Sequence, residues 1–346
     1  MKGNHIQLAL FGVGRWGNHL LRNFLALPTV DVVAVVDMTH DKLQQVRDKF
    51  DLAPEIALTT DVEAVLSRAD VDAVAIATPA ATHYALIKTA LTQGKHVLAE
   101  KPLTLEINES EALCDLAAKH QRQLVIDHTY LFHSVVQQGQ SVLADQPLGT
   151  LRYGYATRTN LGPVRLDVDA LWDLSIHDIT IFNHWLGESP IAVTAQGHVW
   201  LQSEAAPASH FSQGLADVVW LHLFYPSGFQ ATIHVSWANP DKQRRLCVVG
   251  DRGTLIFDEM QAQAPLVMQR GHFEPDGKYF VPAGLGRETI PVPPGEPLKQ
   301  VCQHFVSCIE QREPSAISSG EVGTDLVKVL AALSKSLNHK GERVTV

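Results

Sequence analysis

The chain of 346 residues is long enough for two domains, with one large α/β domain as the alternative. Hydrophobic residues make up 45% of it and charged residues 19%, which is ordinary for a folded soluble protein and excludes disordered, collagen-like and membrane proteins. The 28 Lys and Arg against 37 Asp and Glu give a net charge of −9 with no basic run, so we expect neither nucleic acid nor a membrane as a partner.

The first 127 residues alternate short apolar runs with amphipathic stretches. Short, almost continuously apolar runs are typical of strands buried on both faces of a parallel sheet, and the stretches between them have helical character. This alternation predicts a doubly wound Rossmann sheet. The expected strands are 6–11, 32–36, 73–77, 96–99 and 124–126, and the expected helices are 18–27, 41–50, 61–69, 82–93 and 109–120.

From about residue 128 the pattern changes to strands that follow one another with few helices between them. We therefore predict a Rossmann domain over residues 1–127 and a second α+β domain over residues 128–346, with a large, mainly antiparallel open sheet. Its expected strands are 151–159, 191–200, 217–224, 230–237, 245–250 and 254–258, and its expected helices are 135–144, 174–186, 298–311 and 321–338.

The first predicted strand runs directly into the sequence Gly12-Val13-Gly14-Arg15-Trp16-Gly17, a GxGxxG motif. The three glycines would permit a tight turn, close approach of the backbone to a pyrophosphate, and close packing of helix on strand. Asp37 ends the second predicted strand, where a carboxylate accepts hydrogen bonds from the adenosine ribose. Because a carboxylate repels a 2′-phosphate, we predict NAD as the cofactor, with NADP as the alternative.

Two further loops follow predicted strands and so lie at the same edge of the sheet, where ligands bind in open α/β folds. One contains Thr78, Pro79 and His83, and the other contains Glu100 and Lys101. Pro102 restricts the backbone of Lys101 and stiffens the loop that aims its amine. We predict that both loops contact the cofactor, with an ion pair and a helix cap as the structural alternatives.

These motifs resemble those of the glucose–fructose oxidoreductase / inositol dehydrogenase / rhizopine catabolism (Gfo/Idh/MocA) family, and the resemblance extends over nearly the whole chain. It implies a Rossmann domain, an α/β second domain, NAD or NADP, and hydride transfer on sugars and cyclitols. The matching segments are GVGRWG at 12–17, TPAATH at 78–83, GKHVLAEKPLT at 94–104, DLSIHD at 173–178, VVGDRGTLIFD at 248–258 and GERV at 341–344.

The same resemblance implies that Lys101, Asp173 and His177 are the catalytic residues. An imidazole suits removal of a hydroxyl proton near neutral pH, and an ammonium stabilises the developing alkoxide. Asp173 and His177 are four residues apart and would share one face of a helix. On spacing alone, Asp173 could merely cap that helix.

Four residues of the second domain are candidates for substrate contact: Tyr130, His133, Arg158 and Asn160. An inward-pointing Arg158 would favour a phosphate or nucleotide-diphosphate group on the sugar, because guanidinium binds phosphate bidentately. Ser175 stands where members of the family frequently have glycine. We expect this departure from the family pattern to affect the substrate pocket and not the chemistry. We expect no metal site, because no pair of histidines has the required spacing beside an acid.

We therefore predict an NAD(P)-dependent enzyme that transfers hydride between nicotinamide and a secondary alcohol or ketone of a sugar, a sugar derivative such as a nucleotide sugar, or a cyclitol. The alternatives are a glycoside hydrolase that oxidises its substrate transiently and a dinucleotide-sensing regulator without activity. No apolar run is long enough to span a membrane and no leader cleavage site is evident, so we expect a cytoplasmic protein. An exposed sheet face would favour a homodimer or homotetramer.

Overall fold

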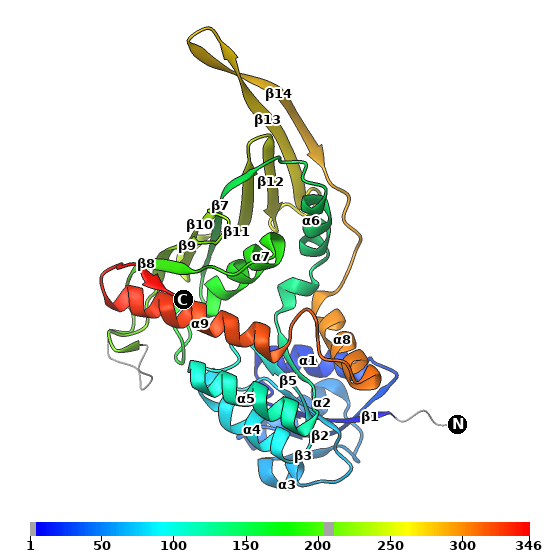
Figure 1. Cartoon of the computed structure of the whole chain (residues 1–346). Helices are drawn as coiled ribbons and strands as arrows, with labels where there is room; N and C mark the ends of the chain where they lie inside the picture. Colours follow the sequence, from blue (N-terminus) through cyan, green and yellow to red (C-terminus); the bar gives the residue numbers. More distant parts are fainter. Residues whose placement is uncertain (1–4, 204–210) are drawn as a thin grey trace. The chain divides into compact units, whose positions relative to one another are not determined.

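The computed structural model describes residues 5–203 and 211–346 and divides into two compact units (Figure 1). The first unit comprises the chain up to Thr129 together with Glu296–Val327, and the second comprises Tyr130–Gly295 with Lys328–Val346. The segment 296–327 therefore packs with the first unit, whereas the sequence analysis assigned it to the second domain. The physical reason is that α8 (Pro297–Gln311) buries its apolar face, including Val301 and Phe305, and packs against α1 (Arg15–Leu25).

The first unit is built on a parallel sheet of six strands in the order β3-β2-β1-β4-β5-β6. This order reverses direction between β1 and β4, which confirms the predicted doubly wound sheet. The strands are β1 (Ile6–Phe11), β2 (Val30–Val36), β3 (Ala57–Thr59), β4 (Ala73–Ile76), β5 (His96–Glu100) and β6 (Leu124–Asp127). The short edge strand β3 has no fully buried residue, and the brief apolar run at residues 56–58 was not predicted as a strand.

Helices connect these strands as the alternating pattern predicts. The first helix begins at Arg15, earlier than expected, because Gly14 already serves as its N-cap. The others are α2 (His40–Phe50), α3 (Val62–Leu66), α4 (His83–Thr92) and α5 (Ile107–His120), and a 3₁₀ turn, Ala80–Thr82, precedes α4. None of the helices in the described part of the chain combines the length and apolarity of a membrane span.

The second unit is built on a sheet of nine strands in the order β14-β13-β12-β11-β7-β10-β9-β8-β15. Its described strand pairs are antiparallel except for β7 with β10, which confirms the predicted, mainly antiparallel sheet. The strands are β7 (Leu151–Leu161), β8 (Ala192–His198), β9 (Val218–Phe224), β10 (Gln230–Ser236), β11 (Ala238–Gly250), β12 (Gly253–Asp258), β13 (Leu266–Asp276), β14 (Tyr279–Thr289) and β15 (Val344–Thr345).

Three helical segments carry Tyr130, Asp173 and His177: a 3₁₀ turn (Thr129–Phe132), a π-helical turn (Leu171–Ser175) and the helix α7 (Ile176–Leu186). The unit also contains α6 (Ser134–Ala144) and the end of α9 (Gly320–Asn338). The hairpin β13–β14 extends beyond the rest of the sheet in Figure 1 and was not predicted. Most of its residues are exposed and lack an apolar alternation that would indicate strands.

Candidate functional site

The turn between β1 and α1 requires glycine at two of its three glycine positions. Gly12 has a φ of +88°, and a Cβ there would lie 2.5 Å from the carbonyl oxygen of Ala77. A Cβ on Gly17 would lie 1.9 Å from the carbonyl oxygen of Gly12, so only glycine lets helix and strand pack this closely. Gly14 is exposed and has open space around its missing side chain, which leaves its backbone accessible to a ligand.

Asp37 lies against this glycine turn. Its Oδ2 accepts a hydrogen bond from the backbone N–H of Val13 at 2.9 Å, and its Oδ1 accepts one from the N–H of Thr39 at 3.0 Å. The carboxylate is therefore held at the end of β2 beside the turn. It is only partly buried, so it keeps oxygen lone pairs available to ribose hydroxyls.

The start of α1 fits an anionic group such as the pyrophosphate of a dinucleotide. Its first turn has no acidic residue and its cap has no side-chain hydrogen bond, so the first backbone N–H groups are not taken by a capping side chain. Arg15 and Trp16 are exposed there, and the indole N–H of Trp16 donates to Asp127 at 2.9 Å. The residues present thus fit NAD, through the backbone at Gly14, the helix start and Asp37.

The two other strand-end loops are joined by His83. Its Nε2 lies 3.0 Å from the carbonyl oxygen of Thr78, and its Nδ1 lies 2.8 Å from that of Pro102. His83 as a residue is 1% exposed, so it has almost no surface to offer a cofactor. His83 therefore holds the loop of Thr78 and Pro79 next to the loop of Lys101, in contrast to its expected role in cofactor contact.

Asp173 lies in the π-helical turn, and His177 lies in the first turn of α7, which follows directly. The Nη1 of Arg165 lies 3.1 Å from Oδ1 of Asp173, and Arg165 also binds Asp167 through two nitrogens. Burial opposes the charge on Arg165, but its hydrogen bond to Asp167 and the charge of Asp173 raise its pKa overall. Asp173 is therefore held by a permanent cation, which the sequence analysis did not predict.

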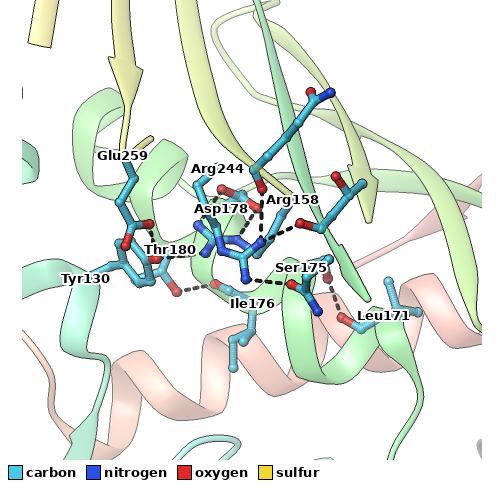
Figure 2. A network of polar contacts seen from close by, with 12 residues as sticks. Tyr130, Arg158, Leu171, Ser175, Ile176, Asp178, Thr180, Arg244 and Glu259 are labelled. Carbon is cyan, nitrogen blue, oxygen red and sulfur yellow. Dashed lines mark hydrogen bonds and ion pairs between the residues drawn. The ribbon is translucent and has the colours of Figure 1, made fainter. Parts of the chain in front are cut away.

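Arg158 lies inside the second unit instead of facing a ligand (Figure 2). Its Nε and Nη2 donate to the two carboxylate oxygens of Asp178 at 2.8 and 2.9 Å, and its Nη1 donates to the hydroxyl of Tyr130 at 2.8 Å. The side chain is 4% exposed. Each guanidinium nitrogen already donates to a protein oxygen, so the expectation that Arg158 binds a substrate phosphate does not hold.

Tyr130 connects this buried ion pair with His177. Its ring centroid lies 5.0 Å from that of His177, and the guanidinium of Arg158 lies 4.5 Å from the Tyr130 ring centroid. Its hydroxyl donates to Glu259 at 2.6 Å. Burial and the negative charge of Glu259 raise the Tyr130 pKa, and the charge of Arg158 opposes this. Tyr130 is therefore a neutral neighbour of His177.

The remaining candidates have local roles. Nδ1 of His133 accepts a hydrogen bond from the N–H of Val135 and caps α6, and burial lowers the pKa of His133. Asn160 donates to the carbonyl of Gly162 at 2.7 Å and accepts from Nη2 of Arg244 at 2.6 Å. His133 and Asn160 are both partly exposed, which leaves each able to contact a ligand.

Sequence reasoning missed four charged residues that support the candidates: Arg165, Asp178, Arg244 and Glu259. Asp178 directly follows His177, and this adjacency is the one signal that could have indicated it. The other three come from segments far along the chain or from a loop. Among the described residues, no group of three or more His, Cys, Asp or Glu is arranged to hold a metal ion.

A doubly wound sheet with a glycine turn, an accessible helix start and a strand-end carboxylate defines a dinucleotide-binding protein of the oxidoreductase class. Residues 6–128 match the oxidoreductase family with an NAD-binding Rossmann fold, and residues 136–256 match the GFO/IDH/MocA C-terminal domain. The chain therefore belongs to the Gfo/Idh/MocA family of NAD-binding oxidoreductases.

Relatives that are named as dehydrogenases align with most of the chain. The UDP-N-acetylglucosamine 3-dehydrogenase of Acidithiobacillus ferrooxidans is 26% identical over 313 residues, which are 90% of each chain. The inositol 2-dehydrogenase of Rhizobium meliloti is 26% identical over 270 residues, which are 74% of this chain and 76% of the relative. The solved structure of GenD2 from gentamicin A biosynthesis, in complex with NAD, has a TM-score of 0.81 at 21% identity and covers 100% of this chain and 97% of its own.

Proposed function

We propose that this oxidoreductase transfers a hydride between NAD and a secondary alcohol, or the matching ketone, of a sugar, a nucleotide sugar or a cyclitol. The observation that carries the proposal is the glycine turn with Asp37 bound to its backbone, which fits a dinucleotide whose ribose hydroxyls are free. The names of the two dehydrogenase relatives supply the substrate class. Because Arg158 is hydrogen-bonded to Asp178, the diphosphate of a nucleotide sugar would have to bind to residues other than Arg158.

The proposed chemistry belongs to Lys101, Asp173 and His177. NAD, when bound, accepts the hydride in the oxidative direction. In that direction His177 removes the hydroxyl proton, because a neutral imidazole is a suitable base near neutral pH. The ammonium of Lys101 stabilises the negative charge that develops on the oxygen. Asp173, held by Arg165, orients the catalytic groups.

A substrate screen tests the substrate class. The purified enzyme is mixed with NAD and with myo-inositol, free sugars or UDP-N-acetylglucosamine in turn, and formation of reduced cofactor is followed by its absorbance. We expect turnover with at least one of these compounds. Absence of turnover with all of them, in both directions and with both cofactors, would refute the proposed substrate class.

Replacement of the lysine tests the catalytic assignment. Lys101→Met should lower kcat by about 10²-fold or more, while the affinity for NAD stays within about twofold. A variant that keeps more than about a tenth of the activity would remove Lys101 from the mechanism. His83→Gln is a useful comparison, since we expect it to disturb both loops and to affect cofactor affinity as well as kcat.

The second candidate function is a glycoside hydrolase that oxidises and re-reduces its sugar around an elimination. A glycosyl hydrolase family 109 protein of Streptomyces filamentosus is 33% identical over 123 residues, but these are only 34% of this chain. Release of a glycoside's leaving group without net change in NADH would favour this function. Stoichiometric NADH formation would favour the dehydrogenase, and both results exclude a regulator without activity.

We also propose an oligomeric state and a cellular location for the protein. Tyr153, Tyr155 and Trp220 are exposed aromatic residues on strands of the large sheet, and Trp220 stacks on His234 at 5.1 Å. Such a face favours a homodimer or homotetramer. Size-exclusion chromatography with light scattering measures the oligomeric mass, and Trp220→Glu should shift this mass toward that of the monomer. We place the protein in the cytoplasm, consistent with its four free cysteines, and cell fractionation tests this.

A further inference from the structure

A cleft lies in the first unit at the edge of the sheet where the strands begin, opposite the edge of the glycine turn. Its volume is about 1620 Å³. The starts of β1, β5 and β6 line it, together with residues 69–72 before β4, the end of α8 and the start of α9. Every residue that lines it belongs to the first unit, so the cleft does not depend on the second unit. Nothing in the proposed reaction uses this edge.

His96, the first residue of β5, is partly exposed and lines this cleft. The backbone N–H of Gln123 donates to Nδ1 of His96 at 2.9 Å, so Nδ1 has no proton. The proton of the neutral ring is therefore on Nε2. Burial, followed by the positive charge of Arg122, lowers the pKa of His96 to about 4, so the ring is neutral at physiological pH.

Arg122 faces the same ring nitrogen. Its Nη1 lies 3.4 Å from Nε2 of His96. Because guanidinium nitrogens can only donate, and because Nε2 of His96 also carries a proton, this contact joins two donors and is not a satisfied hydrogen bond. The Nε of Arg122 is buried and has no partner among the described residues. His96 and Arg122 are both partly exposed where they line the cleft, so an acceptor that enters the cleft can reach these two side chains, whereas the buried Nε of Arg122 has no acceptor in the described part of the chain.

The acidic residues near His96 are bound to other groups. Asp72 accepts the backbone N–H of Gln7 at 2.9 Å, and Asp70 binds Arg68 at 2.7 Å. The buried amine of Lys95 donates to the carbonyls of Arg68 and Val71. The remaining charged residues of the cleft are His5, Asp31, Glu310, Arg312 and Glu321, and His5 pairs with Asp31.

We propose that Arg122 and Nε2–H of His96 form a binding site for an oxyanion, a carboxylate or a phosphate group of a small molecule. One oxygen of such a group would accept from both donors, and the charge of Arg122 would strengthen these bonds. The site lies at the opposite edge of the sheet from the pyrophosphate position, so its ligand does not compete with NAD. It is independent of the proposed function.

The test follows the His96 ring by NMR while sodium phosphate or sodium acetate is added to the intact protein, with sodium chloride at equal ionic strength as the control. His96→Gln serves only to assign the signal. We expect a saturable shift with at least one oxyanion, and a His96 pKa that rises by about one unit because a bound anion favours the charged ring. Phosphate alone, acetate alone or both would each support the site and identify its ligand chemistry.

Two variants test whether Arg122 is responsible. Arg122→Gln should weaken the response by about tenfold or more, because it removes the charge and three of the five N–H groups. Arg312→Gln removes a cation from the same cleft without touching His96 and should change the response by less than about twofold. A shift that chloride reproduces, a shift that saturating NAD abolishes, an equal response in Arg122→Gln, or no saturable shift would each overturn the proposal. The chloride and NAD controls use the unmodified protein, so they decide even if Arg122→Gln does not fold.

Discussion

The buried ion pair between Arg158 and Asp178 offers a sharp test of the second unit. The carboxylate is 2% exposed and the guanidinium 4%, and two hydrogen bonds of 2.8 and 2.9 Å join them. Asp178→Asn keeps the shape of the side chain and removes its charge. It leaves the guanidinium buried without its counter-ion, and loss of one partner of a buried pair costs ~3–5 kcal/mol.

Urea unfolding followed by tryptophan fluorescence measures this cost. We expect Asp178→Asn to lower the free energy of unfolding by ~3–5 kcal/mol. The double variant Arg158→Met with Asp178→Asn should recover part of this loss, because it also removes the buried charge. Asp145→Asn, at an exposed position that follows the last residue of α6 in the same unit, is the control and should change the value by less than about 0.5 kcal/mol.

The interpretation fails if Asp178→Asn costs less than about 1 kcal/mol, the value of an exposed pair. It also fails if the double variant is less stable than Asp178→Asn, since the stranded charge would then not be the cause. A further readout concerns catalysis, because Tyr130 contacts both Arg158 and His177. Loss of the pair should disturb the position of Tyr130 and lower kcat more than it changes KM for NAD.

Three other predictions follow from the first unit. Gly17→Ala should abolish soluble folded protein or NAD binding, because its Cβ would meet the carbonyl oxygen of Gly12 at 1.9 Å, whereas Gly14→Ala has open space and should remain folded in a thermal melt. Asp37→Asn should weaken NAD binding by about tenfold and improve the affinity for NADP relative to NAD, which a fluorescence titration measures; an unchanged ratio of the two affinities would remove Asp37 from cofactor choice. Burial, followed by the charge of Lys101, lowers the pKa of His128 from 6.5 to about 3, so the unfolded chain binds a proton below pH 6.5 that the folded chain does not. His128 should therefore reduce the free energy of unfolding by about 1.4 kcal/mol per pH unit as the pH falls from 6.5 to 3, and His128→Asn should remove this part of the dependence in urea titrations at several pH values.

The sequence predicts the first unit well because its signals are local. Apolar runs mark buried strands, and the glycine pattern marks a turn whose backbone only glycine can adopt. It predicts the orientation of side chains less well. The strand pattern around Arg158 shows only that a polar residue stands at this position. It does not distinguish a guanidinium that faces a ligand from one that faces Asp178. His83 was likewise attributed to the cofactor. Its actual partners are two carbonyl groups from separate loops, and contacts between separate loops are not visible in the sequence.

Long-range packing is the other property that the sequence did not predict. The amphipathic pattern of α8 predicts a helix with a buried face but not the partner of that face, which is α1. The hairpin β13–β14 was missed for a different reason. Its strands bury few side chains beyond Leu266, Val267 and Met268, so its sequence carries no alternation of apolar and polar residues.

The central strand of the large sheet has a consequence for how the protein is made. β7 pairs with β10 on one side and with β11 on the other, and both partners come later in the chain. During synthesis, β7 therefore leaves the ribosome with both edges unpaired, and it stays so while α7, β8 and β9 are translated. Unpaired strand edges promote aggregation. Nascent chains that stop before Gln230 should consequently depend on a chaperone, whereas chains that reach Gly250 can close the sheet around β7.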